Sequence, residues 1–297
     1  MPLVKATASL LAACALVINA LVWGVSWWPF RELQNAGLHP LWATAAVYWL
    51  IVVGMLLFYV SALKGLLANP VLWWLAIASG LTNVGFNWAV TVGDVVRVVL
   101  LFYLMPAWAV LVAWLMLGER PTRGSLLRLL LAMVGVLIVL KTPDSAWPIP
   151  QSGADWLALL GGLSFAITNA LLRKFNHTPS GARMLAMFAG GALLATGVAL
   201  LGMVLHTVPA PSLSSAGIAV FVGLSLAFVA SNAALQYGAA RLPSSTTSLV
   251  MLTEILFASV SAALLGAADF SPRIFWGGSL IVLAALLAAL AHNKNDG

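Results

Sequence analysis

The sequence predicts an all-α integral membrane protein with ten transmembrane helices. Hydrophobic residues make up 62% of the 297 residues and charged residues only 7%, too few to cover a soluble domain. A hydrocarbon core about 30 Å thick needs roughly 20 apolar residues per helix, and the apolar stretches of this chain have that length. Backbone groups in lipid must bond within their own segment, so such spans are helices. We expect them at residues 8–28, 41–61, 71–90, 95–117, 124–141, 156–173, 183–205, 215–237, 244–266 and 274–291.

The short connections between these spans exclude several classes of protein. They leave no room for a nucleotide-binding or soluble catalytic domain, and no phosphate-binding Gly-x-x-x-x-Gly-Lys-Ser/Thr motif occurs. Neither a metal-ligand cluster nor a nucleophile–base pair is apparent, so we expect no enzyme, no metal and no cofactor. The net charge of +6 suits the lysine and arginine excess of cytoplasmic loops better than nucleic-acid binding.

The first span begins like a signal peptide, because Lys5 precedes an apolar run. The small-residue site Ala13-Cys14-Ala15 lies within that run, however, which favours an uncleaved first helix. Within this helix Asn19, Trp23 and Ser26 follow one another at i, i+4 and i+7 and share a face.

The third and fourth spans carry the next polar and aromatic residues. Asn83 and Asn87 share a face of the third span, and Tyr103 and Trp108 lie in the fourth. Pro106, the only proline inside a span, removes a backbone hydrogen bond and should kink the fourth helix. The kink acts either as a hinge or substrate contact, or as a passive feature of packing.

The second half of the chain repeats this pattern. Phe165 and Asn169 share a face of the sixth span, and Asn232 and Gln236 share a face of the eighth. Such polar residues either join helices, at about 0.6–2 kcal/mol per hydrogen bond, or line a wet cavity. Their recurrence, with Trp23, Phe86, Tyr103, Trp108 and Phe165 as aromatic lining, favours a cavity.

Glu254 is the only ionisable acid or base at the middle of a span, and such groups are costly enough to be functional candidates. It can carry protons or contact a substrate ammonium. Alternatively, it is a neutral, hydrogen-bonded structural residue. No histidine lies at mid-span, so no relay partner is visible.

The distribution of basic residues predicts that both termini are cytoplasmic. With the N-terminus inside, four basic residues lie outside, namely Arg31, Arg97, Lys141 and Arg273. The other ten lie inside: Lys5, Lys64, Arg120, Arg123, Arg128, Arg173, Lys174, Arg183, Arg241 and Lys294.

A weak internal repeat divides the chain into residues 1–148 and 149–297. Leu104 and Gly118 match Leu252 and Gly266 at a constant offset of 148 residues. Each half holds five spans, an odd number, so the two halves must point in opposite directions. Inverted repeats are typical of transporters whose substrate site lies near the membrane midplane.

The chain resembles the drug/metabolite transporter superfamily in its ten-helix, two-repeat EamA-type branch. The motifs that carry the resemblance are Trp23-Gly24, the segment around Pro106, and the exit Leu117-Gly118-Glu119-Arg120-Pro121-Thr122. Within the branch, the segment from Leu100 to Pro106 with Trp108 is similar to bacterial aromatic amino-acid exporters. The resemblance implies a transporter in the bacterial cytoplasmic (inner) membrane that exports amino acids or similar metabolites.

We therefore expect an exporter of aromatic and other hydrophobic amino acids that works by facilitated alternating access. The alternative is a proton-coupled drug or metabolite antiporter that uses Glu254. The expected partners are the amino-acid substrate and membrane lipid, with no nucleic acid. The oligomeric state stays open, and a monomer is compatible with the sequence. The expected substrate-binding residues are Asn19, Trp23, Asn83, Asn87, Tyr103, Trp108, Phe165, Asn169, Asn232, Gln236 and Glu254, with Pro106 as hinge.

Overall fold

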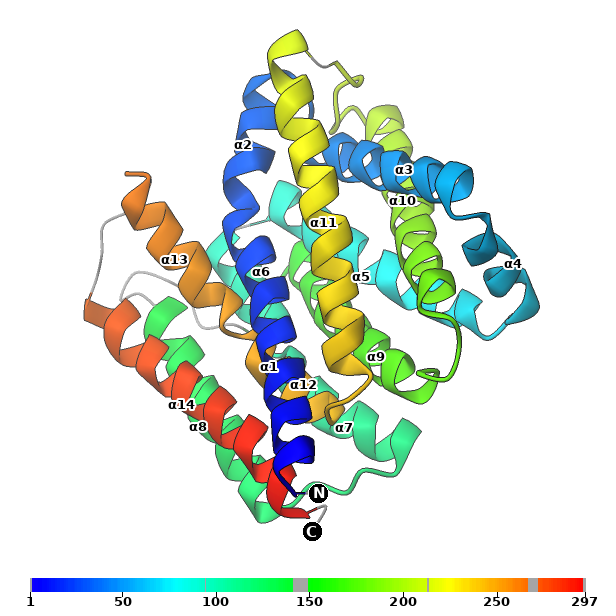
Figure 1. Cartoon of the computed structure of the whole chain (residues 1–297). Coiled ribbons are helices and arrows are strands. Elements are labelled where there is room, and N and C mark those ends of the chain that lie inside the picture. Colours follow the sequence, from blue (N-terminus) through cyan, green and yellow to red (C-terminus); the bar gives the residue numbers. More distant parts are fainter. Residues whose placement is uncertain (1, 94, 141–148, 213, 267–271, 296–297) are drawn as a thin grey trace.

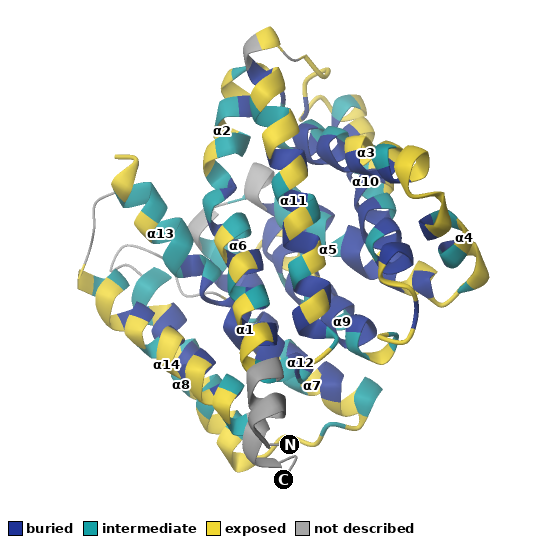
Figure 2. Ribbon diagram, in the orientation of Figure 1, coloured by how far each residue is buried: buried dark blue, intermediate teal, exposed yellow. Residues whose placement is uncertain are grey.

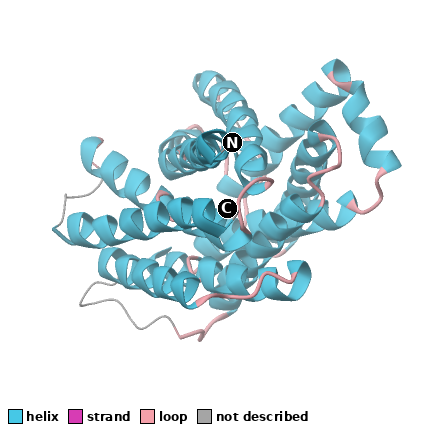
Figure 3. Ribbon diagram, turned by 60° about the horizontal axis from the view of Figure 1, so that its bottom comes forward, coloured by secondary structure: helices cyan, strands magenta, loops and turns pink. Residues whose placement is uncertain are grey.

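The computed structural model describes residues 2–93, 95–140, 149–212, 214–266 and 272–295, and all regular structure in these ranges is helical (Figures 1 and 3). The expected Lys141 and the boundary at residue 148 lie outside the described residues. The helices are α1 (Pro2–Val25), α2 (Trp27–Asn35), α3 (Pro40–Phe58), α4 (Val60–Ala68), α5 (Leu72–Val92), α6 (Val95–Phe102), α7 (Met105–Leu117), α8 (Arg123–Leu140), α9 (Gly153–Lys174), α10 (Ser180–Val204), the 3-10 turn η1 (Ser215–Gly217), α11 (Ile218–Ala239), α12 (Ser244–Met251), α13 (Glu254–Leu264) and α14 (Pro272–Asn295).

The described helices supply the membrane spans that the sequence predicts. Nine segments are long and apolar enough to cross a bilayer, and a tenth is obtained if α4 and α5, bent by 110° at their junction, count as one span. Figure 2 shows exposed residues along the outer faces of the helices. Many large apolar side chains are exposed, for example Leu127 at 67%. Because lipid solvates such surfaces, the all-α, multi-pass membrane fold is confirmed.

Local signals fix several helix ends. Ser152 and Asp155 form a capping box at the start of α9, in which the Ser152 hydroxyl accepts the Asp155 N–H at 3.2 Å and the Asp155 carboxylate accepts the Ser152 N–H at 3.0 Å. Gly118 ends α7 in the left-handed region, at φ 72°, where the absence of a Cβ removes the steric penalty.

Two of the spans are broken in the middle. Between α6 and α7 the helix is interrupted at Tyr103 and Leu104, and between α12 and α13 at Leu252 and Thr253. Pro106 lies in the first turn of α7, where a missing N–H costs little. The interruption expected in the fourth span is therefore present, but it precedes the proline.

The two breaks are related by the offset seen in the sequence. The break at Leu252 and Thr253 follows the break at Tyr103 and Leu104 by within one residue of 148 positions. Gly118 after α7 and Gly266 after α13 are also separated by 148 positions. Gly118 and Gly266 both adopt positive φ, 72° and 67°. The start of α1 and the end of α14 lie at the same end of the bundle (Figure 1), as an even number of spans requires.

Candidate functional site

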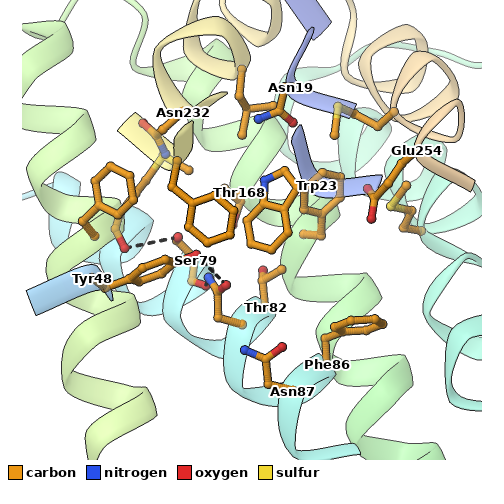
Figure 4. A pocket seen from close by; sticks show the side chains of 18 of the residues that line it. Asn19, Trp23, Tyr48, Ser79, Thr82, Phe86, Asn87, Thr168, Asn232 and Glu254 are labelled. Atoms are coloured by element: carbon orange, nitrogen blue, oxygen red, sulfur yellow. Dashed lines mark hydrogen bonds between the residues drawn. The ribbon is translucent and has the colours of Figure 1, made fainter. Parts of the chain in front are cut away.

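A cavity lies between the two broken spans, and most of the long helices contribute to its wall. About 90 Å³ of it is open to the centres of water molecules, well above the roughly 10–15 Å³ that a single water needs. Its lining residues are Asn19, Trp23, Tyr48, Ser79, Thr82, Asn83, Phe86, Asn87, Phe102, Met105, Phe165, Thr168, Met187, Phe188, Phe228, Asn232, Leu235, Met251 and Glu254 (Figure 4).

Aromatic rings form two groups in the wall. On one side Trp23 stacks on Phe228 with ring centroids 4.6 Å apart, and Tyr48 meets Phe228 edge-on at 6.0 Å. On the other side Phe102 contacts Phe86 at 4.7 Å and Phe165 at 6.3 Å. Rings in such offset and tilted contacts hold one another in place and give the cavity rigid apolar surfaces.

The amide side chains both join helices and face the cavity. Asn83 in α5 accepts a hydrogen bond from the Tyr48 hydroxyl of α3 at 2.8 Å. Asn19 in α1 donates to the carbonyl of Ser231 in α11 at 2.8 Å. Its carbonyl oxygen has no partner among the described residues. The two interpretations of the polar faces, helix association and cavity lining, therefore apply to the same residues.

A polar chain leads from the cavity towards the loop between α9 and α10. The Gln236 amide donates to the Asn232 carbonyl oxygen at 2.7 Å, and Arg183 Nε donates to the Gln236 carbonyl oxygen at 3.2 Å. Arg183 is 5% exposed, and its Nη1 donates to three carbonyls, those of Phe175, Asn176 and Thr178. The guanidinium thus fixes this end of the wall.

Glu254 is the only lining residue that is an ordinary acid or base, since the wall holds no lysine, arginine, histidine or second carboxyl. It begins α13 directly after the break in the ninth span, and in Figure 4 it lies across the view from Tyr48. The hydroxyl of Tyr103, in the break of the fourth span, lies next to its carboxyl. The two chain breaks therefore meet through this pair.

The structure brings together seven of the eleven residues expected from the sequence. These seven line the cavity: Asn19, Trp23, Asn83, Asn87, Phe165, Asn232 and Glu254.

Four others lie outside the wall. Tyr103 is buried beside Glu254, and Gln236 lies behind Asn232. Trp108 packs on a small cluster between α7 and α9, and Asn169 is fully buried with neither amide atom bonded to another described residue.

Sequence reasoning missed several lining residues. Ser79 and Thr82 belong to the same helical stripe as Asn83 and Phe86, so extending that stripe towards the N-terminus identifies them. Thr168 lies next to Asn169 and four residues after Ser164, so the polar face of the sixth span identifies it as well. Tyr48 had no such signal from its immediate neighbours, which are all apolar.

Within the described ranges no group of three histidine, cysteine, aspartate or glutamate side chains is placed to hold a metal ion. The chemistry available in the cavity is thus one carboxyl, several amides and hydroxyls, and aromatic surface. Such a wall can hold a small amphipathic molecule without a fixed ion pair.

Comparison with known proteins bears on the fold and the family. A crystal structure of another protein superposes with a TM-score of 0.73, covering 96% of this chain and 99% of that one, at 16% sequence identity. The two share the fold. The comparison with curated proteins found no match. Residues 10–141, somewhat less than half of the chain, match the model of the EamA-like transporter family.

Proposed function

We propose that the protein exports aromatic and other hydrophobic amino acids by facilitated alternating access. The observation that carries this proposal is the composition of the central cavity, which joins one carboxyl and several amides to aromatic walls and lacks a cationic side chain. Glu254 and the unpartnered carbonyl oxygen of Asn19 accept hydrogen bonds from a substrate ammonium. Trp23, Phe86 and Phe228 surround its side chain, and the neighbouring amides donate to its carboxylate.

The broken spans support alternating access. Residues 1–148 and 149–297 act as two inverted five-helix repeats in this proposal. The matched breaks and the matched positive-φ glycines at nearly one offset support the division. Each break shortens the rigid segments beside the cavity, so α7 and α13 can tilt with Pro106 near the pivot. The protein works in the bacterial cytoplasmic membrane, with both termini in the cytoplasm.

Facilitated transport is favoured over proton coupling because the cavity wall contains a single carboxyl. A carboxyl that stays protonated in apolar surroundings donates and accepts hydrogen bonds but moves no net proton. The alternative is a proton-coupled drug or metabolite antiporter. One contact favours it, the closeness of the Tyr103 hydroxyl to the Glu254 carboxyl, because a phenol can stabilise the carboxylate form.

The test is flux of phenylalanine, tryptophan and methionine across liposomes that contain the purified protein, with and without a pH gradient. We expect flux of all three that does not follow the pH gradient. Glu254→Gln keeps the shape and hydrogen bonding of the side chain without titrating, and substantial flux should remain. Glu32→Gln, in α2 outside the cavity wall, is the matched control.

Two results distinguish the alternatives. Flux of none of the three amino acids contradicts the proposed substrate class. Wild-type flux that follows the proton gradient, together with loss of flux in Glu254→Gln but not in Glu32→Gln, supports the antiporter. Tyr103→Phe then tests whether the Tyr103 hydroxyl supports proton coupling by Glu254, because this substitution removes only the hydroxyl and leaves Glu254 in place to contact substrate.

A further inference from the structure

A second cavity lies at the ends of α7, α8, α12 and α14, and it shares no lining residue with the central one. About 220 Å³ of it is open to the centres of water molecules. Its wall includes the turn after α7, the first turns of α8 and α12, and Ala288 and Ala291 of α14. It is therefore a site between membrane helices at one end of the bundle.

The charge of this wall is positive. Arg120, Arg128 and Arg173 line it, opposed by the single acid Glu119. The Glu119 carboxylate is already engaged, since one of its oxygens lies 2.5 Å from Arg173 Nε. Arg120 is exposed, and the buried Nε of Arg128 has no partner among the described residues. Two positive charges thus face the cavity without a counter-ion in its wall.

The start of α12 adds hydrogen-bond donors. Pro243 precedes the helix and no side chain caps it. The Thr247 N–H returns to the Pro243 carbonyl at 2.9 Å, so the N–H groups of Ser244, Ser245 and Thr246 have no acceptor within the helix. Thr246 is 4% exposed, lines the cavity, and its hydroxyl has no partner among the described residues.

The start of α8 differs, although it reaches the same cavity. Thr122 and Ser125 cap one another there, with the Thr122 N–H donating to Ser125 Oγ at 2.9 Å and the Ser125 N–H donating to Thr122 Oγ1 at 3.1 Å. The hydrogen-bond donors of the cavity wall that lack an acceptor are thus on the first turn of α12 and on Arg128. Free N–H groups at the positive end of a helix, next to arginines, favour an anion.

We propose that this cavity binds a phosphate group. The N–H groups and hydroxyl at the start of α12 bond its oxygens, while Arg120 and Arg128 balance its charge. Its source is either an anionic phospholipid or free phosphate. Exposed leucines beside the cavity, Leu126 on α8 and Leu290 on α14, border lipid and suit a headgroup, as in other basic pockets between membrane helices. A bound phosphate group anchors the N-terminal end of α12. The other end of this helix is Met251, which lines the central cavity.

The experiment is thermal unfolding of the full-length protein in neutral detergent, after washing until native mass spectra show no retained lipid. One arm adds short-chain phosphatidylglycerol and compares it with phosphatidylcholine of equal chain length. The other adds sodium phosphate and compares it with sodium chloride at equal ionic strength. The variants are Arg128→Gln and Thr246→Val. The matched control is Arg123→Gln, an exposed arginine of the same helix start that does not line the cavity.

We expect the phosphate-bearing additive to raise the Tm of the wild type and of Arg123→Gln. Each variant should need at least about tenfold more additive for the same rise, as the loss of a charge-assisted or buried hydrogen bond implies. A response to phosphatidylglycerol alone identifies the lipid as the source, and a response to sodium phosphate identifies the free ion.

No specific rise in either arm, or a rise that both variants retain, overturns the proposal. Thr246→Val keeps the shape of the side chain, so the test survives if Arg128→Gln fails to fold. Because the readout is binding, its outcome is independent of which substrate the central cavity transports.

Discussion

The contact between α1 and α13 gives a sharp prediction for Gly24→Ala. Gly24 follows Trp23, which lines the cavity, and packs against the backbone at the start of α13. A Cβ added at Gly24 would lie 2.6 Å from the carbonyl oxygen of Glu254 and 2.7 Å from the Cβ of Phe257. Both atoms belong to the helix that carries the Glu254 carboxyl, so they cannot yield as the tip of a flexible side chain can.

The displacement follows from these distances. Ordinary van der Waals contact begins at 3.4 Å, so the two helices must separate by about 0.8 Å, an overpacking that typically costs about 1–3 kcal/mol. The movement shifts the first turn of α13 relative to Tyr103 and the aromatic wall. We therefore expect a lower Tm and flux reduced several-fold in Gly24→Ala.

The assay compares this variant with Gly197→Ala. Gly197 lies within α10, and no atom lies within 4 Å of a Cβ added there. Alanine is the better helix former by about 0.5–1 kcal/mol, so the control should keep its flux and keep or raise its Tm. Thermal unfolding and liposome flux are measured on both. Equal Tm and equal flux for the two variants would refute the proposed role of the close approach at Gly24.

Two further predictions concern topology and the loop after α9. In a Cys14→Ser background, cysteines placed at Val4 and Lys294 should not react with an impermeant thiol reagent added outside intact cells, because both termini are expected in the cytoplasm; reaction of either site contradicts that topology. Arg183→Met should lower the Tm more than Arg241→Met, since each buried acceptor left without a partner costs about 1–3 kcal/mol, whereas Arg241 is exposed; equal Tm values in differential scanning fluorimetry would show that the Arg183 contacts contribute nothing.

The sequence by itself determined the membrane fold, because hydropathy along a chain reports directly on the length of apolar helix that a bilayer requires. It also singled out Glu254, since an acid within an apolar span is visible without any knowledge of packing. The glycines at 118 and 266 marked equivalent helix ends because few other residues adopt positive φ.

The tertiary structure alone decided which residues meet. Pro106 marks one broken span, but Leu252 and Thr253 break the other without a proline. Tyr103 lies beside Glu254 although 150 positions of the chain separate them, a contact that depends on how the two broken spans pack.

The sequence does not show how helices pack, and this explains why some expected site residues lie outside the cavity wall. A polar stripe defines a face of one helix, but not which neighbour covers that face. Asn19 and Asn83 therefore reach the cavity, whereas Asn169 is enclosed between helices and Gln236 is taken up by Arg183. Periodicity is a property of one segment, while a cavity is what remains after all the segments have packed, so only the assembled bundle could determine its wall.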